Sequence, residues 1–492
     1  MNSHVDVLLA TRAVSAGRAV RGTTVRHMQL AEDPMGLVVF QMAHEAFSAL
    51  AVAMGRGQTD MNWAVVIEPR NPHLLFRALT PLARRFCTWF RSFSHPRESL
   101  TRRSGLVERA VNAPQLWVPN AATVDLLSRW GRRFSYQRTD GPLAADIALV
   151  EFGRHLQFLG DYARVPGQAL VVAATTLLRR HWVTGQSDLE NENLAALDAW
   201  IEPPHGVVAS EAARAVEDQA VGPLLQPYDE NRIFKVIGEL NSERAGSTDE
   251  SVCSRLTPRL EGECRPFVEH AWGLLWRAIE RERGFTPGSS VEKRWADDRR
   301  AYTEQVDWVE GGGRRRARDS ARRAASLRLR LEESQERLDA QEALDDPLVM
   351  ARLILVGKAL VGTVTDVDRS HREAGPCRMV NRPLVTIETA DPCALPRGMV
   401  LWWTGDPARV SGELVSTTTA STGGSIVVLK ITKGMTGTLP ARGIRACFSE
   451  VTLQSGPRLP LPKTLPWTHR PAHDPTSRSV DDPAEPAWEN AT

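Results

Sequence analysis

The clearest pattern of apolar and polar positions lies in the last third of the chain, where short alternating segments follow one another. In the segment 382–389, Val385 and Ile387 fall on one side of an extended chain, and Thr386 and Glu388 fall on the other. Similar short segments recur, separated by turn residues. The six predicted strands are 358–367, 382–389, 399–403, 410–416, 425–432 and 443–451. Short strands at this spacing predict a small antiparallel barrel or sandwich.

The first 285 residues show mainly helical spacing and predict an α-helical region with a small sheet at most. Apolar side chains recur three and four residues apart, as in 73–93. Asp33-Pro34 is a typical helix start, so we expect a helix from there to about Gly55. Further helices are predicted over 120–130, 142–162, 167–183, 188–201, 207–219, 229–243 and 265–283, and short strands over 63–68 and 115–118.

Between residues 286 and 347 the chain becomes strongly charged. A break at 287–290 is followed by a helix to about Val309, and three glycines then interrupt the pattern. The segment 314–330 holds eight arginines against one acid, and the sign of the charge reverses from Glu332 onward. Two helices on either side of a glycine-rich turn predict an antiparallel hairpin.

These patterns predict an α+β multidomain protein. Its expected parts are a mainly helical region over 1–285, a charged helical hairpin or stalk over 289–346, and a small antiparallel β-barrel over 347–453. The remaining segment, 454–492, is rich in proline and poor in apolar residues, so we expect it to be disordered.

The order of stalk and barrel resembles a known arrangement. The residues that carry the resemblance are Leu327, Leu331 and Leu338 in the helix and Leu360–Val364, Leu395–Leu401, Gly412–Val415 and Gly424–Thr432 in the barrel. Residues 314–453 thereby resemble the front end of superfamily-one helicases related to the nonsense-mediated-decay enzyme. In that family an accessory barrel sits on a helical stalk ahead of the first motor domain.

The chain departs from that family after the barrel, where a phosphate-binding loop should follow. Instead it passes into the proline-rich segment. Gly357-Lys358 lacks the upstream glycine and the following Ser or Thr that a phosphate-binding loop needs. The resemblance therefore implies a helicase front end whose motor, a helicase or ATPase subunit, is supplied by another chain.

Composition limits the remaining possibilities. A net charge of +2 over 492 residues argues against a globally cationic coat for nucleic acid. The six cysteines show no CxxC spacing, which favours a reducing cytosol and a cytoplasmic protein, and no apolar stretch is long enough to span a membrane. Cys253 with Cys264, or His371 with Cys377 and Cys393, are alternatives for a zinc site, but free thiols fit better, so we expect neither metal nor cofactor.

Two groups of residues are candidates for contact with single-stranded nucleic acid. Arginines at the start of the charged helix would face phosphates. Trp402 and Trp403 are adjacent on one strand, so one should point outward, where it could stack on bases beside a lysine. The candidates are Arg314, Arg315, Arg316, Arg318, Arg322, Arg323, Trp402, Trp403, Lys430 and Lys433. The alternatives are a solvated helix with internally paired charges and a tryptophan packed against the rest of the protein.

Three functional hypotheses follow. We expect a non-catalytic accessory protein of a nucleic-acid-processing, helicase-like complex. The first alternative is a protein–protein scaffold, whose partner binding would be insensitive to salt. The second is an enzyme in the N-terminal region, where Glu68, Arg70 and His73 cluster after a predicted strand.

Overall fold

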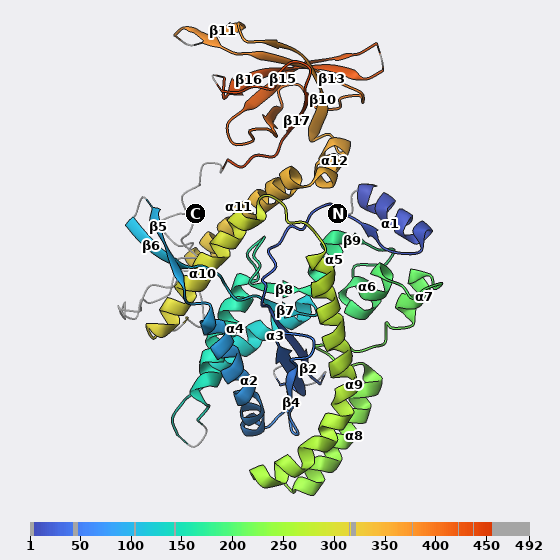
Figure 1. Ribbon diagram of the computed structural model, residues 1–492, viewed down its shortest axis with the longest axis vertical. Helices are drawn as coiled ribbons and strands as arrows, with labels where there is room; N and C mark the ends of the chain where they lie inside the picture. Colours follow the sequence, from blue (N-terminus) through green and yellow to red (C-terminus); the bar gives the residue numbers. More distant parts are fainter. Residues whose placement is uncertain are drawn as a thin grey trace, which may run out of the picture.

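A mixed five-stranded sheet lies in the middle of the N-terminal part of the protein (Figure 1). The computed structural model describes residues 4–42, 48–102, 105–141, 144–313, 315, 321–375, 377–421, 423–435 and 437–454. The strands of the sheet are β2 (Met35–Phe40), β3 (Ala51–Gly55), β4 (Asn62–Val65), β7 (Leu116–Val118) and β8 (Val171–Ala173). Every residue of β2 and β3 is buried, so helices cover both faces of the sheet.

The expected helix between Asp33 and Gly55 is therefore wrong. The segment instead supplies β2 and β3, which pair as antiparallel strands from Gly36 opposite Gly55 to Phe40 opposite Ala51. An apolar run that is buried on both faces lacks the alternation of a half-exposed strand, so its spacing is compatible with a helix as well. The short strands expected near 63–68 and 115–118 are present as β4 and β7.

The order of the strands is β4-β3-β2-β7-β8. β3 pairs antiparallel with β2, and β4 pairs antiparallel with β3. The chain then returns through α2 (Pro72–Ser92) and places β7 parallel to β2 on the other side of β2. The connection to β8 runs through α3 (Ala121–Ser135) and α4 (Ile147–Tyr162). The parallel strands β2, β7 and β8 thus end at one edge of the sheet, with the direction of winding reversing between β2 and β7.

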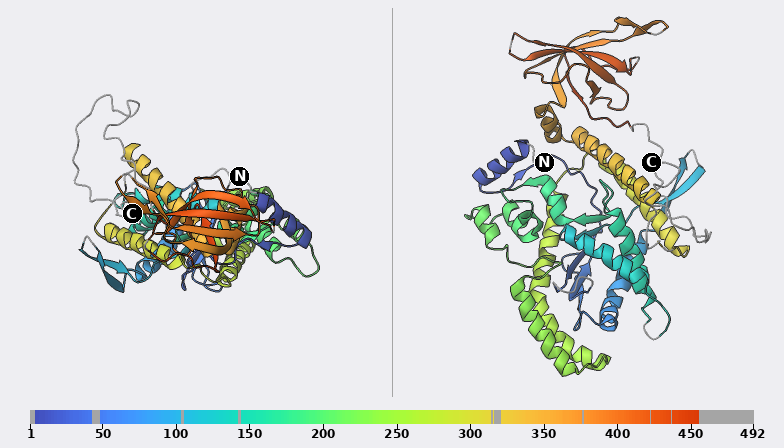
Figure 2. Two further views of the ribbon diagram at one scale, coloured as in Figure 1. Left: turned by 90° about the horizontal axis from the view of Figure 1, so that it is seen from above. Right: turned by 180° about the vertical axis from the view of Figure 1, so that it is seen from behind.

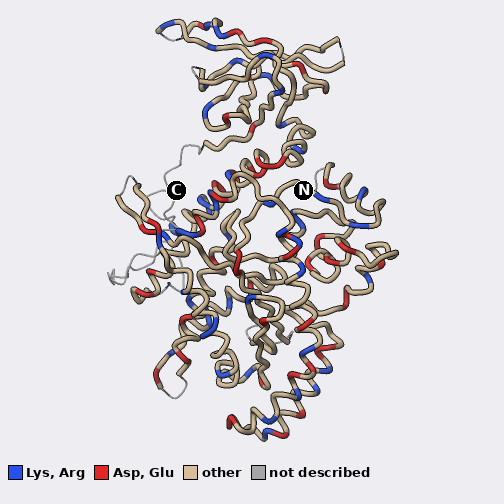
Figure 3. Tube along the Cα trace, viewed as in Figure 1, with Lys and Arg blue, Asp and Glu red and all other residues tan. Residues whose placement is uncertain are grey.

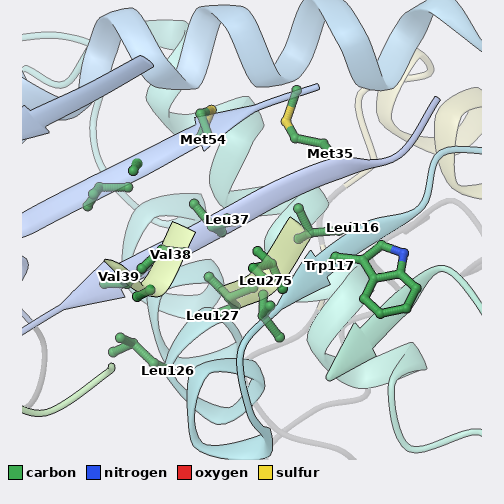
Figure 4. Packing of buried hydrophobic residues seen from close by; sticks show 14 of the residues in the cluster. Met35, Leu37, Val38, Val39, Met54, Leu116, Trp117, Leu126, Leu127 and Leu275 are labelled. Carbon is green, nitrogen blue, oxygen red and sulfur yellow. The ribbon is translucent and has the colours of Figure 1, made fainter. Parts of the chain in front are cut away.

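The remaining N-terminal elements surround this sheet. α9 (Glu250–Arg283) packs against β2, β3 and β4, where Leu275 and Trp272 lie over Gly36. Figure 4 shows Leu275 among the buried residues around β2. The other elements are α1 (His4–Ala16), β1 (Val20–Arg21), β5 (Arg97–Arg102), β6 (Gly105–Ala110), α5 (Ala174–His181), β9 (Trp182–Val183), η1 (Glu190–Glu192), α6 (Leu194–Ile201), α7 (Ala209–Arg214) and α8 (Pro227–Arg244).

Helices α3 and α4 cross at two glycines. A Cβ atom on Gly131 would lie 2.3 Å from the backbone nitrogen of Gln157, and one on Gly153 would lie 2.4 Å from that of Ser135. The missing side chains allow the two backbones to touch, and α4 in turn packs against α2. These contacts fix the loop after α4, which lines the site described below.

We expect Gly131→Ala to lower the free energy of unfolding by about 2 kcal/mol, because the new methyl group must force α3 away from α4. Gly238 in α8 provides the control, since a Cβ there meets no atom within 4 Å. Gly238→Ala should leave stability unchanged or raise it by up to about 1 kcal/mol through helix propensity. Urea denaturation of the two variants measures the difference, and equal midpoints would contradict the close crossing.

The charged region does not form a hairpin that projects from the body. α10 (Val291–Glu310) packs against β6 and α4, and its Trp295, Tyr302 and Val306 belong to the main hydrophobic core. α10 is therefore part of the body. Only α11 (Ala321–Asp345) and α12 (Pro347–Leu355) lead from the body toward the C-terminal domain (Figures 1 and 2).

The predicted barrel is confirmed. Its strands close in the order β10-β13-β16-β15-β14-β17, all antiparallel. They are β10 (Ala359–Asp368), β13 (Leu384–Thr389), β14 (Val400–Trp403), β15 (Ser411–Thr419), β16 (Ser425–Lys433) and β17 (Arg445–Ser449). As the alternation indicates, Val385 and Ile387 point into its core. A two-stranded ribbon of β11 (Arg372–Ala374) and β12 (Met379–Asn381) extends from it.

Buried polar contacts join the body to α12. Asp346, which is fully buried, caps α12 through the Leu348 N–H and accepts from both the N–H and the hydroxyl of Thr24. Its carboxylate also lies 3.5 Å from Nε2 of His27. Burial, and then the nearby His181, lower the pKa of His27 to about 4, so this imidazole is neutral at pH 7.

Candidate nucleic-acid interface

Of the predicted arginines, the structure describes Arg315, Arg322 and Arg323, and these three do not share one exposed face. Arg315 is buried, donates to Oε1 of Gln305 at 3.0 Å, and lies over the rings of Trp308 and Phe158. It therefore anchors the chain to the body. Arg322 is exposed and Arg323 half-buried in the first turn of α11. Arg314, Arg316 and Arg318 lie outside the described residues.

The predicted residues of the barrel also have partners within it. Trp402 is buried, with Nζ of Lys433 4.9 Å from its ring centroid, and Trp403 packs against the barrel core. Lys430 lies 3.3 Å from a carboxylate oxygen of Glu373 and is also paired with Glu413. The structure brings Trp402 and Lys433 together, and it leaves Trp402 buried and Trp403 half-buried.

A basic cleft lies instead between α10, α11 and the loop that follows α4. It encloses a volume of about 230 Å³. Five cationic side chains line it, Lys293, Arg294 and Arg300 from α10 and Arg330 and Arg337 from α11. We call these residues and the space between them the α10–α11 cleft. Figure 3 shows the charged residues along the two helices that form it.

Helical periodicity explains why these side chains converge. Lys293 and Arg300 are seven residues apart on α10, and Arg330 and Arg337 are seven apart on α11. Seven residues are close to two helical turns, so each pair lies on one face of its helix. The two faces meet because Leu338 of α11 is buried close to Gly167 in the loop after α4.

One of the two acids in the cleft is uncharged at neutral pH. Asp298 is buried and accepts hydrogen bonds from the Tyr162 hydroxyl at 2.8 Å and the Ala169 N–H at 2.9 Å. Burial outweighs these bonds and raises the pKa of Asp298 to about 8. The other acid, Asp297, accepts from Arg300 at 2.9 Å. The lining side chains therefore carry a net positive charge at pH 7, although Asp297 offsets the charge of Arg300.

Arg294 fixes the relative position of three elements. Its guanidinium donates to Oε1 of Gln341 on α11 at 2.6 Å and to the carbonyl of His27 at 2.7 Å. Burial lowers the pKa of Arg294, although a guanidinium remains charged throughout the physiological range. Both acceptors are neutral, while the nearby acids Glu342 and Asp345 oppose the lowering of the Arg294 pKa.

No family model, curated protein or solved structure matches this chain. Among the described residues, no helix combines the length and the apolar character that crossing a membrane requires.

The edge of the sheet where ligands bind in many α/β folds is covered by the chain itself. The Gln41 N–H donates to the carbonyl of Pro223 at 2.7 Å, and Nδ2 of Asn120 donates to that of Gly222 at 2.7 Å. Gly222 has a φ of +83°, and a Cβ there would lie 2.5 Å from the carbonyl oxygen of Val39. This close approach lets the segment around Gly222 seal the crevice beyond β2 and β7.

The candidate catalytic group in the N-terminal region has a structural role. Glu68 accepts from the guanidinium of Arg244, whose side chain is almost fully buried. Asn71 caps α2 by accepting from the N–H of His73, which is itself exposed, as is Arg70. Glu68 thus joins the segment before α2 to α8, and its carboxylate is engaged in that contact.

Proposed function

We propose that this chain binds single-stranded nucleic acid through phosphate contacts in the α10–α11 cleft, as a non-catalytic accessory subunit of a nucleic-acid-processing complex. The observation that carries the proposal is the convergence of five cationic side chains on one cleft with two acids: Asp298, which is neutral at pH 7, and Asp297, which pairs with Arg300 and offsets one of the five charges. Four of the five are arginines, which match the oxygens of a phosphodiester with two parallel N–H groups.

The size of the cleft favours contacts to the backbone over reading of the bases. Its volume of about 230 Å³ is below that of most pockets that enclose an organic ligand. Tyr162 is buried and its hydroxyl donates to Asp298, so it does not offer an open stacking surface. We expect binding that depends on charge and single-stranded flexibility and is nearly independent of sequence.

Fluorescence anisotropy with labelled single-stranded RNA and DNA of mixed sequence tests the proposal. We expect binding in 50 mM KCl that weakens steeply by 200 mM, because each neutralised phosphate adds about −0.7 to the slope of log K against log salt. About three contacts would give a slope near −2. Absence of binding in 50 mM KCl, or a slope near zero, would overturn the proposal.

The pH dependence of oligonucleotide binding should follow the ionisation of Asp298. Below its pKa of about 8 the carboxyl is protonated, and above it a negative charge enters the cleft. We therefore expect affinity for the oligonucleotide to fall by up to about tenfold between pH 7 and pH 9 at constant salt. In Asp298→Asn, which stays neutral, affinity should change by less than about twofold over this range. A wild-type profile as flat as that of the variant would contradict this role.

The motor of such a complex would come from a second chain, as the resemblance of stalk and barrel implies. The barrel is attached through α12, and Ala343, Met350 and Ala359 form a small core at that joint. Purification of the tagged chain from its own cells, with assay of nucleic-acid-stimulated ATPase activity in the eluate, tests this part. Activity that co-purifies with the intact chain and is lost when the barrel is deleted would support it. An eluate without ATPase activity would contradict it.

A further inference from the structure

A cluster of three potential metal ligands lies between α2 and α4, away from the residues of the α10–α11 cleft. Cys87 comes from α2, and Glu151 and His155 lie one turn apart on α4. One ligand atom of each residue lies within 4.8 Å of the other two. Thiolate, imidazole and carboxylate are the donors that zinc takes in proteins.

His155 supplies an independent reason to expect a ligand here. The residue is 1% exposed, its Nδ1 has no hydrogen-bond partner among the described residues, and its Nε2 contacts only the carboxylate of Glu151. The nearest charged atom is Oε1 of Glu151, 3.5 Å from Nε2, while one ring face lies 4.1 Å, centroid to centroid, from Phe90. An unpaired polar group in a protein interior costs about 1–3 kcal/mol, so such groups usually contact something.

We propose that Cys87, Glu151 and His155 bind a divalent cation of the zinc class. The ligand atoms in a tetrahedral zinc site are about 3.3–3.8 Å apart. Rotations of the Cys87 and Glu151 side chains that move atoms by about 1 Å would bring the cluster to that geometry. The Glu151–His155 pair already has the i, i+4 spacing that places two side chains on one helix face.

The protonation states of Glu151 and His155 favour metal binding, and that of Cys87 opposes it. Contact with His155, opposed by burial, lowers the pKa of Glu151, and burial lowers that of His155, so carboxylate and neutral imidazole are both available at pH 7. Burial raises the pKa of the Cys87 thiol. Metal binding must therefore displace the Cys87 proton, and a bound cation is the influence that does so.

Glu151 is half-buried, whereas Cys87 and His155 are buried. Glu151 also lines a cavity of about 460 Å³ together with Tyr136 and three arginines, Arg91, Arg138 and Arg154. Nε of Arg91 lies 3.3 Å from Oε1 of Glu151, so this guanidinium must move to the second oxygen when the metal binds. The cavity is also lined by Asp140 and Glu310, and Arg138 pairs with Asp140, so its lining holds as many carboxylates as arginines.

Cobalt titration of the purified, chelator-treated full chain tests the site. We expect one Co²⁺ per chain, with the near-ultraviolet charge-transfer band that a cobalt–thiolate bond produces. Cys87→Ser should lose the band, and His155→Gln should bind cobalt about 100-fold more weakly or worse, beyond the usual effect of residues outside the ligand shell. Cys377→Ser, which changes an exposed cysteine, is the matched control and should retain the band.

Two outcomes would overturn the site: no thiolate band in the wild-type protein, or an equal band in Cys87→Ser. If Cys87→Ser does not fold, a variant that replaces Cys377, Cys393 and Cys447 by serine takes its place, since these three cysteines are not fully buried. That variant should retain the full band. Loss of its band would assign cobalt to one of these three thiols and would likewise overturn the proposal.

Discussion

We expect the double substitution Lys293→Glu with Arg337→Glu to lower the affinity of the chain for a single-stranded oligonucleotide by about 30-fold at low salt. Each position changes from an attraction to a repulsion of phosphate, and every such change is worth up to about 1 kcal/mol in a partly exposed site. The two residues lie on different helices but line the same cleft. Both substitutions should therefore weaken binding of the same oligonucleotide, and anisotropy titration in 50 mM KCl measures the loss of affinity.

The matched control is Arg322→Glu with Arg328→Glu. This pair carries the same change of charge on the same helix, α11, but both side chains are exposed and neither lines the cleft. We expect a loss of less than about tenfold, which comes from the overall field alone. A larger loss of affinity in the control than in the cleft variant would indicate that the oligonucleotide binds at the arginine-rich start of α11 instead.

Glu282→Ala lowers the free energy of unfolding by about 3–5 kcal/mol, because it breaks a buried charged contact. Glu282 and His181 are both fully buried, with Oε2 of the carboxylate 2.5 Å from Nδ1 of the imidazole. Burial lowers the pKa of the nearby Arg26, and the Glu282 carboxylate opposes that shift. The substitution leaves the Arg26 guanidinium buried without this compensating charge.

Glu280→Ala is the control for this effect on the same helix. Glu280 pairs with Arg283 three residues along, and its side chain is 61% exposed. An exposed pair of this kind is worth less than about 1 kcal/mol. Urea denaturation followed by circular dichroism compares the two variants. Equal losses of stability would show that the buried His181–Glu282 contact contributes no more to the free energy of unfolding than the exposed pair.

The parts of the fold that sequence patterns predict are those in which one face of an element is polar. The barrel follows from alternation such as Val385 and Ile387 against Thr386 and Glu388, and α3 follows from its cap at Asn120, which accepts from the N–H of Thr123. The central sheet is different, since β2 and β3 are buried on both faces and carry no polar stripe. For such strands the periodicity signal is lost, and tertiary packing alone distinguishes them from a helix.

The site was predictable only in part, for a related reason. The spacing of seven residues in Lys293 and Arg300, and again in Arg330 and Arg337, is visible in the sequence. Nothing local shows that the two faces meet, because that depends on where the loop after α4 lies.

The predicted role of Arg315 illustrates the opposite case. A local run of arginines indicates an exposed ridge, yet the chain turns tightly at Gly313, where a Cβ would lie 2.3 Å from the Trp308 ring. That turn places Arg315 over the Trp308 and Phe158 rings.

Photo-crosslinking of a 4-thiouridine-containing single strand, followed by mapping of the modified peptides, tests the central claim most directly. The cleft geometry predicts crosslinks within α10 (Val291–Glu310) and α11 (Ala321–Asp345) that disappear at high salt and in the Lys293→Glu, Arg337→Glu variant. Crosslinks confined to the barrel strands, or crosslinks in α10 and α11 that persist unchanged in the variant, would contradict it.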